Sequence, residues 1–333
     1  MKVSRIVFAF FLLCFFGIGF AYSQDKSKKD KSKDKDSSPQ SIQVKANLMV
    51  LEPNNNFADI KLEDIKIYED GAEQKITYFA KKENALNIGL VMDNTGSMRS
   101  QFNRITAAGV TFVNNIRLQD EVFVIRFVDS DHIEILQEWT ANKKLLNSAL
   151  SNMFIEGGRS AVIDAIYLAV NEVLEREKTD KSKRSAIILI TDGEDRDSYY
   201  NQKELFDLLK TSDVQIFIIG LTQDLSDQRN EYTKKKNPKT DSENFIKLLA
   251  LKTGGAAFIL EGKNKEFENA LVQSLKSILT ELNSQYVIGY TSTNQKRDGL
   301  ARKLTVQIAD GANGEKRQAF IRESFVVPEE KNK

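Results

Sequence analysis

The chain has few of the residues that build disulfides and zinc sites. Among its 333 residues there is one cysteine, Cys14, and one histidine, His132. A single cysteine cannot form a disulfide within the chain, and thiolates and imidazoles are the usual zinc ligands. A disulfide framework and a zinc centre are therefore excluded. We assign no functional role to the lone His132, which follows two aspartates near the end of a predicted strand.

An excess of charge of one sign is also absent. Lysine plus arginine number 48 and aspartate plus glutamate number 47, so the net charge is +1. A chain with this balance has no overall field that would attract nucleic acid or an anionic membrane. No zinc-finger, P-loop or RNA-binding motif is found in the sequence. We therefore expect no nucleic-acid partner.

Long apolar runs are absent except at the start of the chain. Lys2 and Arg5 precede an apolar run over 6–20, and small residues follow at 21–23. This order is typical of a secretory signal peptide, which we place at 1–23. An uncleaved anchor is the alternative, although the run is short for a bilayer span. We expect a periplasmic or secreted protein with no membrane span after removal of the signal.

A charged, low-complexity segment follows at 24–39, with the sequence QDKSKKDKSKDKDSSP. It holds no apolar side chains whose burial would offset the entropy of ordering it. We interpret it as a disordered linker. Binding of an acidic surface polymer is the other interpretation, and the interleaved aspartates weaken it.

The segments 40–84 and 285–328 are both rich in β-strand patterns. Apolar residues alternate with polar ones from Ile42 to Val50, and two further strand-like runs are joined at Asp70-Gly71, a strong hairpin signal. The C-terminal segment contains similar runs. Because a few strands are unstable alone, we predict that the two segments pair with each other in a small β-sandwich.

The segment 85–284 alternates between apolar strands and amphipathic helices. The strands are predicted at 86–92, 121–128, 186–191, 214–221 and 256–260. The helices are predicted at 101–117, 143–153, 161–177, 201–211, 242–252 and 265–283. Such continuously apolar strands are buried on both faces, and intervening helices connect parallel strands. The fold class is therefore α/β, with a doubly wound, mostly parallel sheet flanked by helices.

Oxygen-bearing side chains follow three of these elements. Asp93 ends the first strand, and Thr95 and Ser97 follow it; Asp192 ends another strand, and Ser160 precedes a helix. Ligands of open α/β sheets bind at the carboxyl ends of the strands, so these side chains should converge there. Carboxylate and hydroxyl oxygens favour Mg²⁺ or Mn²⁺, with Ca²⁺ as an alternative.

The mixture of donors favours binding over catalysis. If the two aspartates act through bound water, the direct ligands are mostly neutral hydroxyls. The metal then remains electron-poor and keeps a position for a carboxylate from a partner. We therefore expect a non-enzymatic protein whose partner is a protein or another ligand with an acidic group.

Three stretches of sequence resemble the metal-ion-dependent adhesion site of von Willebrand factor A domains: DNTGSM, GGRSAVIDAI and ITDGEDRDS. The Asp-x-Ser/Thr-x-Ser motif of that family is matched by Asp93, Thr95 and Ser97. Ser160 stands where the family has threonine, four residues before Asp164, and Asp192 matches the third motif. The resemblance implies a Rossmann-like fold over 85–284 and adhesion to protein or matrix ligands through the metal. Some members of that family are switched by movement of their last helix, and the predicted helix at 265–283 stands at the corresponding place in this chain.

Alternative functions would require other residues than those found in this sequence, or other features. A metal-dependent phosphatase-like hydrolase would use Asp93 as its nucleophile and would need a second carboxylate where Thr95 stands. A helper subunit of an ATP-driven metal-insertion machine and a channel-like relative are further alternatives. The insertion at 223–244, which contains Lys234-Lys235-Lys236, is either a loop that selects acidic partners or a solvated loop.

Overall fold

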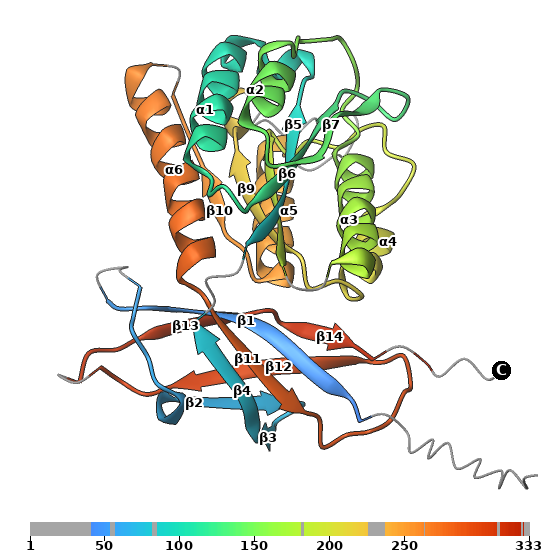
Figure 1. Ribbon diagram of the computed structural model, residues 1–333. Helices are drawn as coiled ribbons and strands as arrows, with labels where there is room; N and C mark the ends of the chain where they lie inside the picture. The colour runs from blue at the N-terminus through green and yellow to red at the C-terminus, as the bar shows by residue number, and fades with distance from the viewer. Residues whose placement is uncertain are drawn as a thin grey trace, which may run out of the picture. The chain divides into compact units, whose positions relative to one another are not determined.

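The computed structural model describes most of the chain beyond residue 40 (Figure 1). The described ranges are 41–53, 57–81, 85–180, 183–225, 237–262, 264–311, 314–327 and residue 329. Residues from Ser41 onward form one compact unit. The predicted signal peptide and linker, and the lysine triplet at 234–236, lie outside the described residues.

A six-stranded sheet forms the centre of the α/β domain, in the order β10-β9-β8-β5-β6-β7. Its strands are β5 (Leu86–Asp93), β6 (Glu121–Phe127), β7 (Ile133–Thr140), β8 (Arg184–Thr191), β9 (Gln215–Gly220) and β10 (Ala257–Ile259). Neighbouring strands are parallel except at the edge, where β7 is antiparallel to β6. Every residue of β5, β8 and β9 is buried, as expected for strands covered on both faces.

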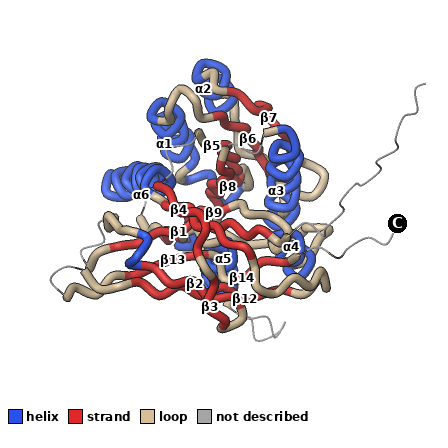
Figure 2. The backbone as a smooth tube through the Cα atoms, turned by 60° about the horizontal axis from the view of Figure 1, so that its bottom comes forward, coloured by secondary structure: helices blue, strands red, loops and turns tan. Residues whose placement is uncertain are grey.

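Helices cover both faces of this sheet (Figures 1 and 2). One face packs against α1 (Phe102–Asn115), α2 (Lys143–Ser151) and α6 (Lys265–Ser284). The other packs against α3 (Val162–Thr179), α4 (Gln202–Leu209) and α5 (Pro238–Thr253). The predicted doubly wound α/β fold class is thus confirmed. No helix in the described part of the chain is long and apolar enough to cross a membrane.

One strand of the sheet was not predicted from the sequence. β7 has the sequence IEILQEWT, and all its residues are half-buried or exposed. It pairs on one side only, because it lies at the edge of the sheet. An edge strand of this kind lacks the continuous apolar run that identified the central strands.

The two terminal segments together form two four-stranded antiparallel sheets, as predicted. One has the order β13-β1-β11-β4 and the other β14-β12-β2-β3. The N-terminal strands are β1 (Gln43–Leu51), β2 (Ile65–Glu69), β3 (Ala72–Gln74) and β4 (Ile76–Lys81). The C-terminal strands are β11 (Tyr286–Thr291), β12 (Ala301–Ile308), β13 (Gln318–Ile321) and β14 (Ser324–Val326). Their buried apolar side chains form one shared core.

The predicted hairpin at Asp70-Gly71 joins β2 to β3. Both turn residues have positive φ angles, 49° and 83°, which is the conformation of a type I′ turn. The run after the turn is not one strand, however. β3 pairs in one sheet, and β4, which begins at Ile76, pairs in the other. The chain therefore changes sheet at Lys75, a step that strand periodicity does not reveal.

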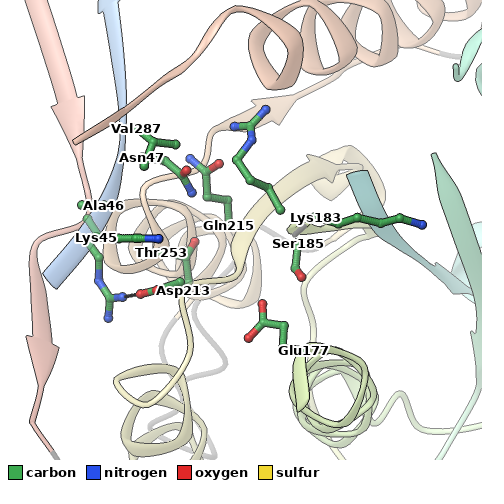
Figure 3. A pocket seen from close by; sticks show the side chains of 12 residues that line it. Lys45, Ala46, Asn47, Glu177, Lys183, Ser185, Asp213, Gln215, Thr253 and Val287 are labelled. Atoms are coloured by element: carbon green, nitrogen blue, oxygen red, sulfur yellow. Dashed lines mark hydrogen bonds and ion pairs between the residues drawn. The ribbon is translucent and has the colours of Figure 1, made fainter. Parts of the chain in front are cut away.

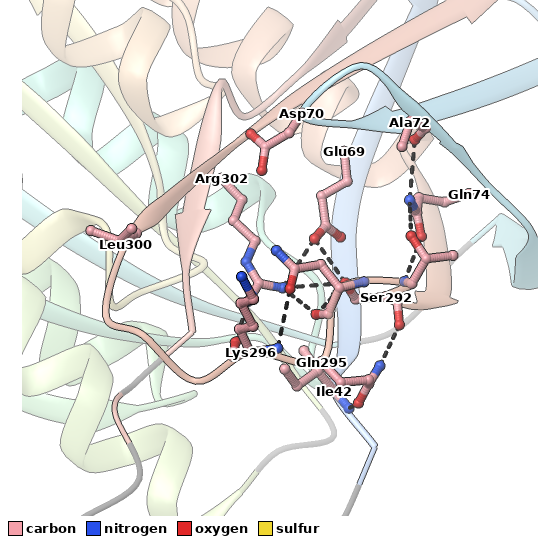
Figure 4. Close-up of polar contacts among 12 residues, drawn as sticks. Ile42, Glu69, Asp70, Ala72, Gln74, Ser292, Gln295, Lys296, Leu300 and Arg302 are labelled. Atoms are coloured by element: carbon pink, nitrogen blue, oxygen red, sulfur yellow. Dashed lines mark hydrogen bonds and ion pairs between the residues drawn. The ribbon is translucent and has the colours of Figure 1, made fainter.

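A charged pair is buried inside the sandwich (Figure 4). Arg302 Nη1 donates to Glu69 Oε1 at 3.0 Å, and both residues are only 2% exposed. Ser292 Oγ and the Tyr290 hydroxyl also donate to Glu69, at 2.7 and 2.9 Å. Every partner of this carboxylate comes from the C-terminal segment. The network therefore links the two ends of the chain within one core.

Candidate metal-binding site

Asp93 is the last residue of β5 and is only 2% exposed. Its Oδ1 atom accepts hydrogen bonds from the backbone amide and the hydroxyl of Thr95, at 3.0 and 2.6 Å. Its Oδ2 atom accepts from the hydroxyl of Thr191, the last residue of β8, at 2.7 Å. Two neighbouring strands thus hold the carboxylate at the carboxyl edge of the sheet.

Ser97 extends this arrangement toward solvent. Its Oγ atom lies 2.9 Å from Oγ1 of Thr95, within a 3₁₀ turn over Gly96–Ser100. Thr95 is buried and Ser97 is exposed. The first motif therefore forms a short series of oxygens that leads from a buried carboxylate to the surface.

Asp192 follows β8 directly and is also buried. Its Oδ1 atom accepts a hydrogen bond from the amide of Glu194 at 2.9 Å. The intervening Gly193 has φ of +77°, and a Cβ atom there would lie 2.7 Å from Cδ1 of Ile246. Glycine is required at this position because both the backbone conformation and the close packing exclude a side chain.

Ser160 has a strained backbone and a side chain with no partner. Its φ angle is +44°, in the left-handed region that non-glycine residues seldom adopt. Its carbonyl accepts from the amides of Arg196 and Asp197, at 3.0 and 3.1 Å, which ties its loop to that of Asp192. Its Oγ atom is buried and makes no hydrogen bond. A buried hydroxyl without a partner is costly unless something else supplies one.

The two carboxylates of the site carry negative charge that no cation in the described residues neutralises by an ion pair. Burial raises the pKa of Asp93, and the negative charge of Asp192 raises it further. Burial likewise raises the pKa of Asp192. Two buried carboxylates side by side are stabilised in their charged form by a bound cation.

The predicted residues are brought together. Thr95, Ser97, Ser160 and Asp192 line an open cavity of about 460 Å³, and Asp93 is hydrogen-bonded directly to Thr95. The described residues contain no cluster of three or more histidine, cysteine, aspartate or glutamate side chains suited to a metal. A cation here would depend on hydroxyl oxygens beside two carboxylates, a donor set that fits Mg²⁺.

Sequence reasoning missed several residues that hold the site. Thr191 binds Asp93, and the side-chain amide of Asn94 donates to the carbonyl of Phe154 at 2.8 Å. Asp164, which the second sequence motif already contained, accepts from the amides of Tyr199 and Tyr200, at 2.7 and 2.9 Å, and so anchors the loop after Asp192. Thr191 directly precedes the predicted Asp192, and its polar side chain in an apolar strand was the available signal.

Asp195 and Asp197, in the loop after Asp192, both have defined hydrogen-bond partners. Asp195 accepts from the amide of Ile163 at 3.2 Å, at the start of α3. Asp197 accepts from the hydroxyl of Ser130 at 2.9 Å. These contacts brace the loops around the site.

A Rossmann-like sheet with oxygen donors from three loops at its carboxyl edge is the arrangement expected for the domain family that the sequence motifs resemble. Residues 87–251 match the model of the von Willebrand factor type A domain family. The chain therefore contains a domain of this family, as the three sequence motifs suggested. A search of curated protein sequences gave no match.

Several solved structures are similar to this chain in fold. An aerotolerance-related membrane protein from Bacteroides fragilis is 18% identical, with a TM-score of 0.45, over 60% of this chain and 99% of that one. BatB from Bacteroides thetaiotaomicron is 14% identical, with a TM-score of 0.43, over 59% and 100% of the two chains. The vWF domain of the type V pili tip protein Mfa5 from Porphyromonas gingivalis is 11% identical, with a TM-score of 0.44, over 60% and 97%.

Proposed function

We propose that this is an exported, non-enzymatic binding protein that engages a protein or another acidic ligand through a divalent cation. The observation that carries the proposal is the buried, unpartnered Oγ of Ser160, which lines the same cavity as Asp192 and the hydroxyls of Thr95 and Ser97. Membership of the von Willebrand factor type A family supports a binding or adhesion role.

The residues that would hold the cation are Asp93, Thr95, Ser97, Ser160 and Asp192. A bound Mg²⁺ or Mn²⁺, or alternatively Ca²⁺, would supply positive charge between two buried carboxylates and a Lewis-acidic position for a partner's carboxylate. The hydroxyl of Ser160 would gain the partner that it lacks within the protein. The open cavity above the site supports access for an acidic side chain.

The contacts of Asp93 support binding over hydrolysis. Both of its oxygens accept hydrogen bonds, two on Oδ1 and one on Oδ2. A carboxylate stabilised by three donors is a weak nucleophile. The hydroxyl of Thr95, which stands where a phosphatase-like enzyme needs a second carboxylate, cannot serve as a general acid–base at neutral pH. These features favour a non-enzymatic protein over the hydrolase alternative.

Calorimetric titration with Mg²⁺, Mn²⁺ and Ca²⁺ tests the metal site directly. We expect the full chain to bind one equivalent of at least one of these ions, and the Asp93→Ala variant to lose that binding because a buried anionic donor is removed. The matched control is Asp131→Ala, which removes an exposed acid from the loop that follows β6. Equal binding by the parent and Asp93→Ala, or no binding by the parent, would contradict the proposal.

The Ser160→Gly variant tests the role of Ser160 in metal binding with little change in the stability of the fold. Glycine relieves about 1 kcal/mol of left-handed strain, and its greater freedom in the unfolded chain costs about 0.5–1 kcal/mol. We therefore expect the free energy of unfolding without metal to change by less than about 1 kcal/mol. The affinity for Mg²⁺ should fall, since one oxygen donor is lost. Unchanged Mg²⁺ affinity would remove Ser160 from the proposed ligand set.

A further inference from the structure

A second cavity, of about 310 Å³, lies at the opposite ends of the strands from Asp93 (Figure 3). Ser185 and Gln215 stand at the amino ends of β8 and β9. Further lining residues are Glu177 near the end of α3, Thr253 at the end of α5, and Lys45 and Asn47 on β1. The volume is at the lower end of the range for small-molecule sites.

The strand pattern of β1 explains why this cavity has a polar wall. Val44, Ala46 and Leu48 are buried in the sandwich core. Lys45 and Asn47 alternate with them and so project from the outer face of the same sheet. In Figure 3 the side chain of Lys45 extends from β1 into the cavity.

Several polar groups around the cavity have unused hydrogen-bonding capacity. Ser185 is only 5% exposed, and its Oγ atom lies beside the carboxylate of Glu177. Gln215 donates through Nε2 to the carbonyl of Gly254 at 2.7 Å, which leaves Oε1 as an acceptor. This wall of the cavity therefore offers polar groups that a ligand with hydrogen-bonding groups could contact.

Two charges on facing walls also lack ionic partners among the described residues. Glu177 forms no ion pair there, and burial raises its pKa, as expected for a carboxylate without a nearby cation. The ammonium group of Lys45 lies 5.8 Å from the ring centroid of Tyr78 and forms no ion pair in the same part of the chain. A negative and a positive group therefore face the cavity from the α/β domain and from the sandwich.

The other cations of the cavity are already engaged. Arg322 pairs with Asp213, and Lys183 pairs with Glu121 at 2.5 Å. The guanidinium of Arg184 donates to the side chain of Gln285 at 2.8 Å and to the carbonyl of Leu282. These contacts leave Glu177 and Lys45, together with the buried Nε of Arg184, as the charged groups with free capacity for a ligand.

We propose that this cavity binds a small zwitterion, an amino acid or a short peptide. The ammonium group of the ligand lies toward Glu177, the hydroxyl of Ser185 and Oε1 of Gln215. Its carboxylate lies toward the ammonium of Lys45 and the side-chain amide of Asn47. A ligand with one charge of each sign pairs with both Glu177 and Lys45, whereas an anion or a cation alone leaves one of these two charges unpaired.

Thermal unfolding of the full chain in EDTA, with each of the twenty amino acids and with diglycine and triglycine, tests this proposal. At least one probe should raise Tm in a saturable way, because it binds only the folded protein. Its N-acetylated and its C-amidated derivatives should each bind at least tenfold more weakly. EDTA removes divalent ions, so the result is independent of the metal site.

Variants assign the binding to this cavity. Glu177→Gln and Lys45→Met should each weaken the best probe at least tenfold, while Asp93→Ala at the opposite edge should bind it as the parent does. No shift with any probe would overturn the proposal. Binding retained by both Glu177→Gln and Lys45→Met, or by the N-acetylated probe, would overturn it as well.

Discussion

Glu281→Gln is expected to stabilise the protein at pH 8 by about 3 kcal/mol. Glu281 lies in the last turn of α6 and is only 6% exposed. Its Oε1 atom has no hydrogen-bond partner. Arg184 on the adjacent β8 is bonded to Gln285 and to the carbonyl of Leu282 instead. Glutamine keeps the shape of the side chain and removes the buried charge.

The effect depends on pH in a defined direction. Burial raises the pKa of Glu281 from its ordinary value of 4.5 to about 7 in the folded protein. Between these values the folded state keeps a proton that the unfolded state releases, so stability falls as pH rises. The contribution of the protonated carboxyl is complete below pH 4.5 and is lost above about pH 7.

Urea denaturation at pH 5 and at pH 8 measures this difference. The parent should lose stability between the two values, and Glu281→Gln should lose about 3 kcal/mol less. Glu268→Gln is the matched control, because Glu268 is exposed on the same helix; its effect should be below about 0.5 kcal/mol. If Glu281→Gln follows the same pH dependence as the parent, Glu281 is not the buried acid responsible.

Arg302→Met is expected to destabilise the protein by about 3–5 kcal/mol. Methionine fills much of the same volume but leaves the carboxylate of Glu69 buried without its cation. Glu69 would keep hydrogen bonds from Ser292 and Tyr290, which do not compensate its charge. Desolvation of an unpaired charge is therefore the main cost.

The double variant Glu69→Gln/Arg302→Met shows whether the unpaired charge is the cause. Removing both charges should recover most of the loss, because the neutral amide leaves no buried charge and its single oxygen can still accept from one of the two hydroxyls, Ser292 or Tyr290. Denaturant unfolding followed by circular dichroism gives the free energies for the cycle. A loss below about 1 kcal/mol in Arg302→Met, or a double variant as unstable as the sum of the single ones, would show that the pair contributes little.

Much of the fold was predictable because its elements have strong local patterns. The strands β5, β8 and β9 are apolar throughout, since each is buried on both faces. The turn at Asp70-Gly71 was predictable because its left-handed conformation favours those residue types. β7 was missed, since an edge strand needs fewer apolar residues and shows a weaker pattern.

The candidate site was only partly readable from the sequence. Asp93, Thr95 and Ser97 lie within five residues, so one motif contains them. The contact of Thr191 with Asp93 joins residues that are 98 positions apart, and no local pattern predicts it. The unpartnered hydroxyl of Ser160 is likewise visible only when the surrounding side chains are in place.

The sequence by itself determined the order of strands and helices, the α/β class and the three loops with oxygen donors. These depend on periodicity and on short motifs, which are properties of neighbouring residues. Only the tertiary structure decided which charges are buried and which are paired. Arg302 meets Glu69 across 233 positions, whereas Glu281 meets no cation at all among the described residues. The reason is physical: desolvation and pairing depend on every group packed around a charge, and most of those groups lie far away in the chain.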